Sequence, residues 1–213
     1  MIGDLRIAVP RGALFGETLD LLDTLGVDTA EARANDRKLL FDSGQLITMR
    51  PSDVPSYVEA GAADIGVTGK DVLMEQSERN VYELVDLGFG RCSMVLASVE
   101  GDDAAGEALR RLGVMRVATK YPKTAAAYFE RTGRQAEIVE VKGSVELAPL
   151  TGLAEAIVDL TATGTTLREN GLVEREQIAA STARLVANPV AHKLKAAEVD
   201  AVLERVRECE PSA

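Results

Sequence analysis

Short apolar runs alternate with amphipathic stretches along most of the chain. Runs rich in Val, Ile, Ala and Leu predict buried strands, whereas apolar positions spaced three and four residues apart predict helices. The predicted strands cover residues 6–9, 46–49, 63–67, 81–87, 93–98, 116–118, 136–141, 156–160, 172–179 and 183–187. The predicted helices cover residues 14–25, 104–112 and 124–132, and shorter ones begin after Gly69, after Ser144 and at Thr165. This alternation is typical of α/β proteins whose parallel strands are joined by right-handed helical crossovers.

Two further helix starts are marked by capping signals. Ser52 is expected to cap a helix that accommodates Pro55 in its first turn and stops at Gly61. Asn188 and Pro189 mark the second start, because asparagine is a favoured N-cap and proline suits the first helical position. The last predicted helix has one apolar face, which is formed by Val199, Val202, Leu203 and Val206. We expect this face to pack on the N-terminal part of the chain.

The alternation is interrupted by two glycines, Gly88 and Gly90, which predict a domain boundary. A return crossing is expected at residues 180–182, between two predicted strands. The sequence has no repeat of fixed period and no low-complexity tract. We therefore predict one domain made of residues 1–88 plus 182–213 and a second domain made of residues 89–181.

The composition suits alanine-rich helices packed on parallel sheets, since 46% of the residues are hydrophobic and only 4% are aromatic. No stretch approaches the ~20 apolar residues that span a bilayer. The first residues lead into a predicted strand without a basic and then apolar leader. Cys92 and Cys209 do not form the pattern of a disulfide framework. We therefore expect a cytoplasmic enzyme without a membrane contact.

The net charge of −10 argues against a nucleic-acid partner, because such binding depends on a basic surface that neutralises phosphates. It does not exclude a small phosphorylated ligand, since screening limits the reach of the global charge to about 8–10 Å. Local cations decide such a site. In the first half of the chain they lie near predicted strand ends or loops, at Arg11, Arg37, Lys38, Arg50, Lys70 and Arg91.

The most informative segment surrounds the predicted strand at residues 156–160. Asp159 closes this strand, and residues 161–166 form a loop of threonines around Gly164 that leads into a helix. Backbone N–H groups and threonine hydroxyls of such a loop bind anions, and the carboxylate can accept hydrogen bonds from sugar hydroxyls. A phosphorylated ribose satisfies both features. The loop alone does not decide the ligand, because small polar residues connect strand to helix in many α/β proteins.

The full spacing is more specific than the loop. This spacing resembles the signature of ATP phosphoribosyltransferase, the first committed enzyme of histidine biosynthesis. The signature consists here of Glu146, five residues, Gly152, an apolar run to Asp159 and then Thr-Gly-Thr-Thr-Leu. Other segments are similar to this family in the same order, namely residues 5–12, 50–59, 61–73, 81–87, 91–92 and 116–122. The resemblance therefore spans nearly the whole chain.

The resemblance implies a fold and a reaction. The implied fold has two α/β domains with mainly parallel sheets, similar to type II periplasmic binding proteins, with the active site in the interdomain cleft. The implied reaction transfers the phosphoribosyl group of 5-phosphoribosyl 1-pyrophosphate to N1 of ATP and releases pyrophosphate, with Mg²⁺ held mainly through substrate phosphates. Such a displacement requires positioning and charge neutralisation and no covalent nucleophile. No transition-metal site is visible in the sequence.

The resemblance also implies roles for individual residues. The phosphoribosyl pyrophosphate is expected to contact Asp159, Ala162, Thr163, Gly164, Thr165 and Thr166. The catalytic residues are expected to be Arg11, Asp159 and Glu146. ATP is expected to contact Arg11, Arg37, Arg50, Asp64, Gly69 and Cys92.

Several of these residues have structural explanations that the sequence leaves open. Glu146 is equally well explained as a helix-capping residue, and Cys92 as a small buried thiol. A single arginine is by default a solvated or ion-paired surface residue. The family commonly has Lys-Gly-Arg where this chain has Arg11, Gly12 and Ala13, so one cation is missing at Ala13. His192, the single histidine, has no acidic or cysteine cluster around it and is interpreted as structural.

Partners are implied by the length of the chain. The family has a long form with a C-terminal regulatory domain of about 70–80 residues, and this chain resembles the short form. Short chains of the family work with a separate regulatory subunit related to histidyl-tRNA synthetase, in a hetero-octamer, and a homodimer of the catalytic chain is expected. The same fold also serves ligand binding, so a cytoplasmic phosphosugar sensor is the alternative hypothesis.

Overall fold

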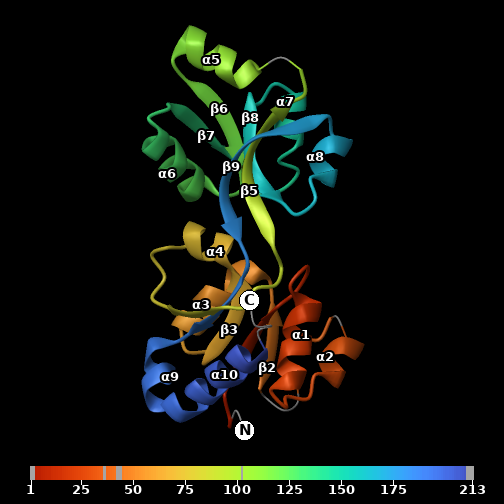
Figure 1. Ribbon diagram of the computed structural model, residues 1–213, viewed down its shortest axis with the longest axis vertical. Coiled ribbons are helices and arrows are strands. Elements are labelled where there is room, and N and C mark those ends of the chain that lie inside the picture. Colours follow the sequence, from red (N-terminus) through yellow and green to blue (C-terminus); the bar gives the residue numbers. More distant parts are fainter. Residues whose placement is uncertain (1–2, 36, 42–44, 102, 210–213) are drawn as a thin grey trace. The chain divides into compact units, whose positions relative to one another are not determined.

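The computed structural model describes residues 3–35, 37–41, 45–101 and 103–209. The chain forms two compact units. Unit 1 comprises Met1–Gly90 and Thr182–Ala213, and unit 2 comprises Arg91–Ser181. Within the described residues, each unit is built on a five-stranded sheet (Figure 1).

The sheet of unit 1 has the strand order β2-β1-β3-β10-β4. Strand β1 pairs in parallel with β2 and β3, whereas β10 pairs antiparallel with β3 and β4. Parallel strands end at a common edge of the sheet, which is where ligands of open α/β sheets bind. The bounds of the strands are β1 (Ile7–Pro10), β2 (Leu46–Met49), β3 (Ile65–Gly69), β4 (Tyr82–Asp86) and β10 (Ala183–Ala187).

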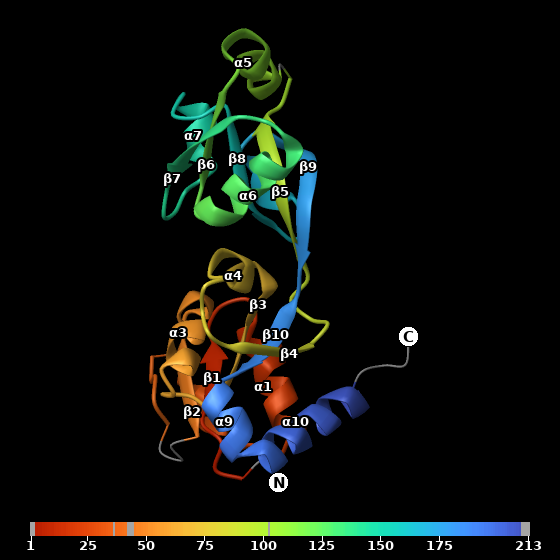
Figure 2. The same cartoon turned by 90° about the vertical axis from the view of Figure 1, so that its left-hand side faces the viewer.

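Helices cover both faces of this sheet, because the side chains of β1 alternate between two cores. Ile7 and Val9 are buried with apolar residues of α1 and α10, whereas Ala8 is buried with residues of α3. Figure 2 shows α1 and α3 on opposite sides of β1. The helices of unit 1 are α1 (Phe15–Thr24), α2 (Ala30–Ala34), the 3₁₀ helix η1 (Pro51–Asp53), α3 (Val54–Glu59), α4 (Lys70–Glu75), α9 (Pro189–Leu194) and α10 (Ala196–Cys209).

The sheet of unit 2 repeats this plan with the order β7-β6-β8-β5-β9. Strand β6 is parallel to β7 and β8, and β5 is antiparallel to β8 and β9. The strands are β5 (Cys92–Val99), β6 (Met115–Thr119), β7 (Ala136–Glu140), β8 (Ala156–Thr161) and β9 (Leu172–Ser181). The helices are α5 (Ala104–Leu112), α6 (Pro122–Thr132), α7 (Leu147–Leu150) and α8 (Thr165–Glu169). Strand β8 lies in the middle of this sheet, so residues at its end are enclosed on both sides.

The predicted α/β class is confirmed, with one refinement of the sheets. In each sheet one strand runs against the other four, β10 in unit 1 and β5 in unit 2. Both strands enter their sheet from the other unit without the helical crossover that a parallel neighbour requires. The sheets are therefore mixed, although most of their strands share one direction.

Two predicted helix starts have different outcomes. Asn188 caps α9 as expected, because its Oδ1 accepts hydrogen bonds from the N–H groups of Val190 at 2.8 Å and Ala191 at 2.9 Å. The prediction for Ser52 is wrong. The chain turns into η1 with Arg50 at its N-cap position, two residues before Ser52, so Ser52 lies inside that turn and Asp53 occupies the N-cap position of α3.

The C-terminal segment forms two helices rather than one, because the backbone leaves the helical conformation at Lys195. The apolar face predicted for the last helix is confirmed, since Val199, Val202 and Val206 are buried in the core of unit 1. Helix α2 carries too few apolar residues to be detected from periodicity. None of the described helices combines the length and apolar character needed to cross a membrane.

Candidate functional site

The first candidate residue, Asp159, lies in β8, where its side chain is only 10% exposed. Because β6 and β8 are parallel neighbours with Thr119 opposite Val158, the residue after β6 comes to lie beside Asp159. This residue is Lys120, whose Nζ is 3.1 Å from Asp159 Oδ1. The N–H of Leu160 donates to the same oxygen at 2.8 Å. Within the described part of the chain, Oδ2 has no protein partner and remains available to a ligand.

Burial, two neighbouring charges and one backbone hydrogen bond determine the pKa of Asp159. Burial raises the pKa of this carboxyl above its ordinary value, and the negative charge of Glu146 acts in the same direction. Lys120 and the N–H of Leu160 oppose this rise, because both stabilise the carboxylate. Sequence reasoning gave Lys120 no role. The signal that could have found it is a lysine directly after a predicted strand that neighbours the strand of Asp159.

Glu146 is the second acid of this site. It occupies the N-cap position of α7, yet its side chain makes no capping hydrogen bond. The capping explanation that the sequence left open is therefore not supported by the contacts. Its negative charge contributes to the raised pKa of Asp159.

The threonine loop after β8 is held in one conformation by its own hydrogen bonds. Gly164 has a φ of 69°, a left-handed conformation that favours glycine, and occupies the N-cap position of α8. Its N–H donates to Thr161 Oγ1 at 2.8 Å. The hydroxyl oxygens of Thr163 and Thr165 are 2.9 Å apart. The loop therefore presents hydroxyl and backbone donors, the groups that bind a phosphate.

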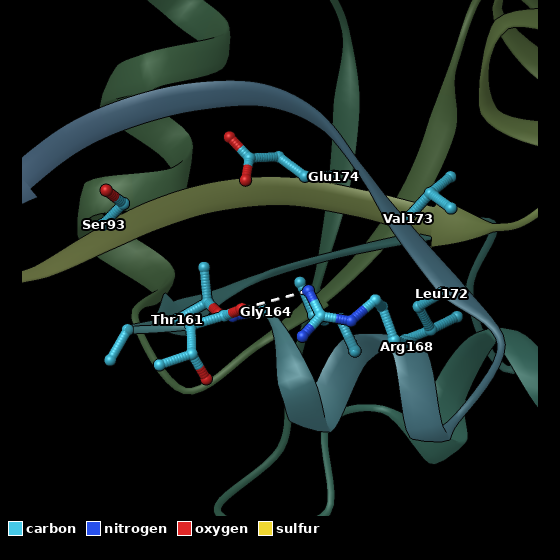
Figure 3. A pocket seen from close by; sticks show the side chains of 10 residues that line it. Ser93, Thr161, Gly164, Arg168, Leu172, Val173 and Glu174 are labelled. Atoms are coloured by element: carbon cyan, nitrogen blue, oxygen red, sulfur yellow. Dashed lines mark hydrogen bonds between the residues drawn. The ribbon is translucent and has the colours of Figure 1, made fainter.

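A pocket of about 320 Å³ lies beside this loop (Figure 3). Figure 3 shows the Arg168 side chain directed from α8 toward the loop at Gly164, with Glu174 on β9 and Ser93 on β5 at the other side. The pocket brings together three of the expected phosphate-binding residues, Ala162, Thr163 and Gly164. Thr165 and Thr166 begin α8 and are exposed. The pocket is lined by Ser93, Thr161, Ala162, Thr163, Gly164, Leu167, Arg168, Leu172, Val173 and Glu174.

In unit 1, three candidate ATP-binding residues lie where parallel strands end. Arg11 follows β1, Arg50 follows β2, and Gly69 closes β3. The N–H of Arg11 donates to the carbonyl of Met49 at 2.7 Å, which keeps the ends of β1 and β2 together. Arg50 has an exposed side chain. The structure therefore brings these three residues to one edge of the sheet of unit 1.

The guanidinium of Arg11 contacts the chain itself. Its Nη2 donates to the carbonyls of Asn35 at 3.2 Å and Lys38 at 2.7 Å, and its Cζ lies 4.5 Å from the centre of the Phe15 ring. Asn35 in turn accepts hydrogen bonds from the N–H groups of Arg37 and Lys38, each at 3.1 Å. Arg11 thus holds the backbone that carries the exposed Arg37 beside the end of β1.

Two expected ATP contacts lie elsewhere. Asp64 precedes β3, at the opposite end of that strand from Gly69. Its Oδ2 accepts hydrogen bonds from the N–H of Arg6 at 2.7 Å and from Lys195 Nζ at 3.0 Å. Strand direction therefore places Asp64 at the edge of the sheet opposite Arg11, Arg50 and Gly69. Cys92 is the half-buried first residue of β5 in unit 2.

His192 packs against an aromatic ring, with ring centres 5.5 Å from Tyr82 and the planes nearly perpendicular. This contact agrees with the structural interpretation of the histidine. The described residues contain no group of three or more His, Cys, Asp or Glu side chains that could hold a metal ion.

Comparison with known proteins decides the family. The family model described as ATP phosphoribosyltransferase matches residues 50–208. The chain belongs to the ATP phosphoribosyltransferase family. It is 55% identical over 205 residues to the ATP phosphoribosyltransferase of Rubrobacter xylanophilus, covering 95% of this chain and 94% of that protein. It is 43% identical over 206 residues to the Bacillus subtilis enzyme of the same name, covering 95% and 93%.

Solved structures agree with this family and with the fold. The ATP phosphoribosyl transferase (HisG:HisZ) complex from Thermotoga maritima contains a chain with 34% identity and a TM-score of 0.79, covering 96% of this chain and 97% of that one. The periplasmic aliphatic sulphonate binding protein SsuA from Escherichia coli has 14% identity and a TM-score of 0.60, covering 96% and 71%. The second likeness concerns the fold alone. It agrees with the expected similarity to periplasmic binding proteins.

Proposed function

We propose that this chain transfers the phosphoribosyl group of 5-phosphoribosyl 1-pyrophosphate to N1 of ATP and releases pyrophosphate. The observation that carries the proposal is the buried Asp159 beside a hydroxyl-lined glycine loop, in a chain of the ATP phosphoribosyltransferase family. The sensor alternative receives no support from the site or from the relatives.

The sugar phosphate is assigned to unit 2. The loop residues Ala162 to Thr166 would hold the 5-phosphate through backbone and hydroxyl donors. Oδ2 of Asp159 would accept hydrogen bonds from the ribose hydroxyls, while Lys120 opposes the rise in the pKa of this carboxyl that burial causes. A carboxylate held in this way stabilises positive charge at the anomeric carbon as the bond to pyrophosphate breaks. Glu146 adds a second negative charge nearby.

ATP is assigned to residues of unit 1. The exposed Arg37 and Arg50 and the backbone at Gly69 remain the proposed contacts. Arg11 acts chiefly by holding the segment that carries Arg37, since its guanidinium already binds two carbonyls. Asp64 is no longer proposed. Cys92, which lies in unit 2, also stays a proposed contact.

Mg²⁺ is the proposed cofactor. Magnesium in phosphate-transfer sites is held by one or two carboxylates and by substrate oxygens. Oδ2 of Asp159 is a carboxylate oxygen of this kind, but it is assigned to the ribose hydroxyls, so Mg²⁺ would be held mainly through the phosphates of the substrates. Magnesium would neutralise the leaving pyrophosphate, and the chain would supply at most a single carboxylate oxygen.

The proposed assembly includes other chains. The Thermotoga maritima relative was solved as a complex of HisG with HisZ. We propose that this chain likewise works with a regulatory subunit related to histidyl-tRNA synthetase, as a homodimer within a hetero-octamer. We also propose a cytoplasmic location, because the chain belongs to a family of biosynthetic enzymes.

The decisive test is pyrophosphate release from ATP, phosphoribosyl pyrophosphate and Mg²⁺, with the near-ultraviolet absorbance of the adduct followed in parallel. The chain is assayed alone and with a regulatory subunit of the HisZ type. Formation of both products establishes the reaction. Absence of both products, with the subunit present and sugar phosphate bound, would overturn the proposal in favour of a sensor.

A further inference from the structure

Arg168, which the sequence analysis left without a role, turns back from α8 onto the threonine loop that precedes this helix. Its Nη1 donates to the carbonyl of Thr163 at 3.0 Å, and its Nη2 donates to Thr165 Oγ1 at 3.1 Å. The first of these hydrogen bonds is visible in Figure 3. These two acceptors flank Gly164. One planar guanidinium thus bridges both sides of the loop's central residue.

The exposed guanidinium of Arg168 has no carboxylate partner among the residues that the structure describes. Both of its acceptors are neutral oxygens, and no described carboxylate lies within ion-pair distance of it. Glu174 lines the same pocket but does not pair with it. Elsewhere in unit 2, Arg134 is paired with Glu176 at 2.6 Å. A positive charge therefore stays beside exposed hydroxyls, where an anionic ligand group would complete the arrangement.

Arg168 joins the two threonine hydroxyls in one hydrogen-bonded network. A guanidinium can only donate, so Thr165 Oγ1 must accept from it. Thr165 Oγ1 lies 2.9 Å from Thr163 Oγ1, and either hydroxyl can be the donor of that pair. Thr163 Oγ1 also receives the N–H of Thr165 at 3.4 Å. The guanidinium and both hydroxyls therefore hold one another in place.

Gly164 lies directly beside this guanidinium. A Cβ atom at Gly164 would lie 2.9 Å from Arg168 Nη1, the far end of a flexible side chain, so an alanine there would displace the guanidinium rather than the backbone. The glycine itself is favoured by its φ of 69°.

We propose that Arg168 is a positioning residue for the 5-phosphate of phosphoribosyl pyrophosphate. It locks the Thr163–Thr165 loop and supplies a positive charge that no described carboxylate neutralises. This inference rests on the proposed function. It predicts an effect confined to the sugar phosphate, because both side-chain hydrogen bonds of Arg168 are made to this loop.

The test compares Arg168→Met and Arg168→Lys with a matched control, Arg175→Met. Arg175 also donates to a hydroxyl and a carbonyl, Ser98 Oγ and Val99 O, each at 2.8 Å, and forms no ion pair with a described residue. The readouts are kcat, the KM for each substrate, the calorimetric Kd for phosphoribosyl pyrophosphate, and the thermal midpoint. Assays contain the regulatory subunit.

Arg168→Met is expected to raise the KM and Kd for phosphoribosyl pyrophosphate about tenfold or more, since hydrogen bonds and charge near an anion are lost together. The KM for ATP should stay within about twofold, and kcat should change less than KM. The KM and Kd of Arg168→Lys for phosphoribosyl pyrophosphate should lie between those of wild type and Arg168→Met, because lysine keeps the charge but cannot donate to both acceptors in the fixed geometry of a guanidinium. Arg175→Met should resemble wild type.

Three outcomes would overturn the inference. The first is an Arg168→Met enzyme with an unchanged Kd for phosphoribosyl pyrophosphate while wild type reacts normally, a result that leaves the proposed function intact. The second is an equal rise in both KM values together with a lower thermal midpoint, which indicates a purely structural role. If Arg168→Met does not fold, a wild-type Kd in Arg168→Lys counts as the first outcome. The third is a wild-type assembly without transferase activity, which removes the proposed function and this inference together.

Discussion

Replacing Asp159 by asparagine changes one oxygen of the proposed sugar site. The two donors on Oδ1, the N–H of Leu160 at 2.8 Å and Lys120 Nζ at 3.1 Å, require an acceptor at that position. The amide oxygen of asparagine must therefore take the Oδ1 position, which places its NH₂ group where Oδ2 faces the ligand. A donor then meets the ribose hydroxyls in place of an ionised acceptor.

The loss can be estimated from the contact that disappears. A hydrogen bond to a charged group contributes about 1.5–3 kcal/mol, which corresponds to a fall of about 10- to 150-fold in kcat/KM. The assay is initial-rate pyrophosphate release at varied phosphoribosyl pyrophosphate concentration. The matched control is Asp103→Asn, because Asp103 accepts the N–H of Gly106 at the start of α5 and asparagine caps helices equally well.

The fold should survive the substitution. Burial raises the pKa of Asp159 in the folded state, so the folded chain binds its proton more tightly than the unfolded chain does. Stability therefore falls as pH rises through the range from the ordinary aspartate pKa to the raised one, and stays lower above it. Asparagine avoids this loss, so Asp159→Asn should gain stability relative to wild type as pH approaches neutrality. Unchanged kcat/KM, or a variant that loses stability at neutral pH, would refute the reasoning.

Three further substitutions test neighbouring parts of unit 2. Gly164→Ala should lower the unfolding free energy by about 1–2 kcal/mol in urea titration, because alanine is strained at a φ of 69°. Lys120→Met should move the acid limb of the kcat/KM profile to higher pH, because the lysine opposes the raised pKa of Asp159. Glu176→Gln should lower stability by about 0.5–1 kcal/mol at neutral pH. Arg134 lowers the pKa of Glu176, so this difference should vanish as pH falls through that lowered pKa.

A defined experimental result would contradict each of these three predictions. Gly143, whose added Cβ would meet open space, is the control for Gly164, and equal effects at the two glycines would remove the backbone argument. Lys120→Arg should keep the wild-type profile, and a shifted limb there would show that charge is not the cause. A pH-independent stability difference for Glu176→Gln would mean that its ion pair contributes nothing.

The local sequence was sufficient to locate the threonine loop and Asp159. The loop is contiguous, and its conformation depends on hydrogen bonds between near neighbours and on the freedom of Gly164 to adopt a positive φ. Strands were likewise predictable, because an apolar run that alternates with helical periods carries its signal within a few residues. The start of α9 at Asn188 was found for the same reason.

Contacts between distant segments were decided only by the tertiary structure. Lys120 meets Asp159 because β6 and β8 are parallel neighbours, a pairing that no short window of sequence specifies. Asp64 lies in a segment similar to the family, yet strand direction puts it at the edge opposite Gly69. Side-chain chemistry and caps act over a turn or two and can be read from sequence. Strand order and direction depend on how the whole chain buries its apolar surface, and they determine which of those side chains meet.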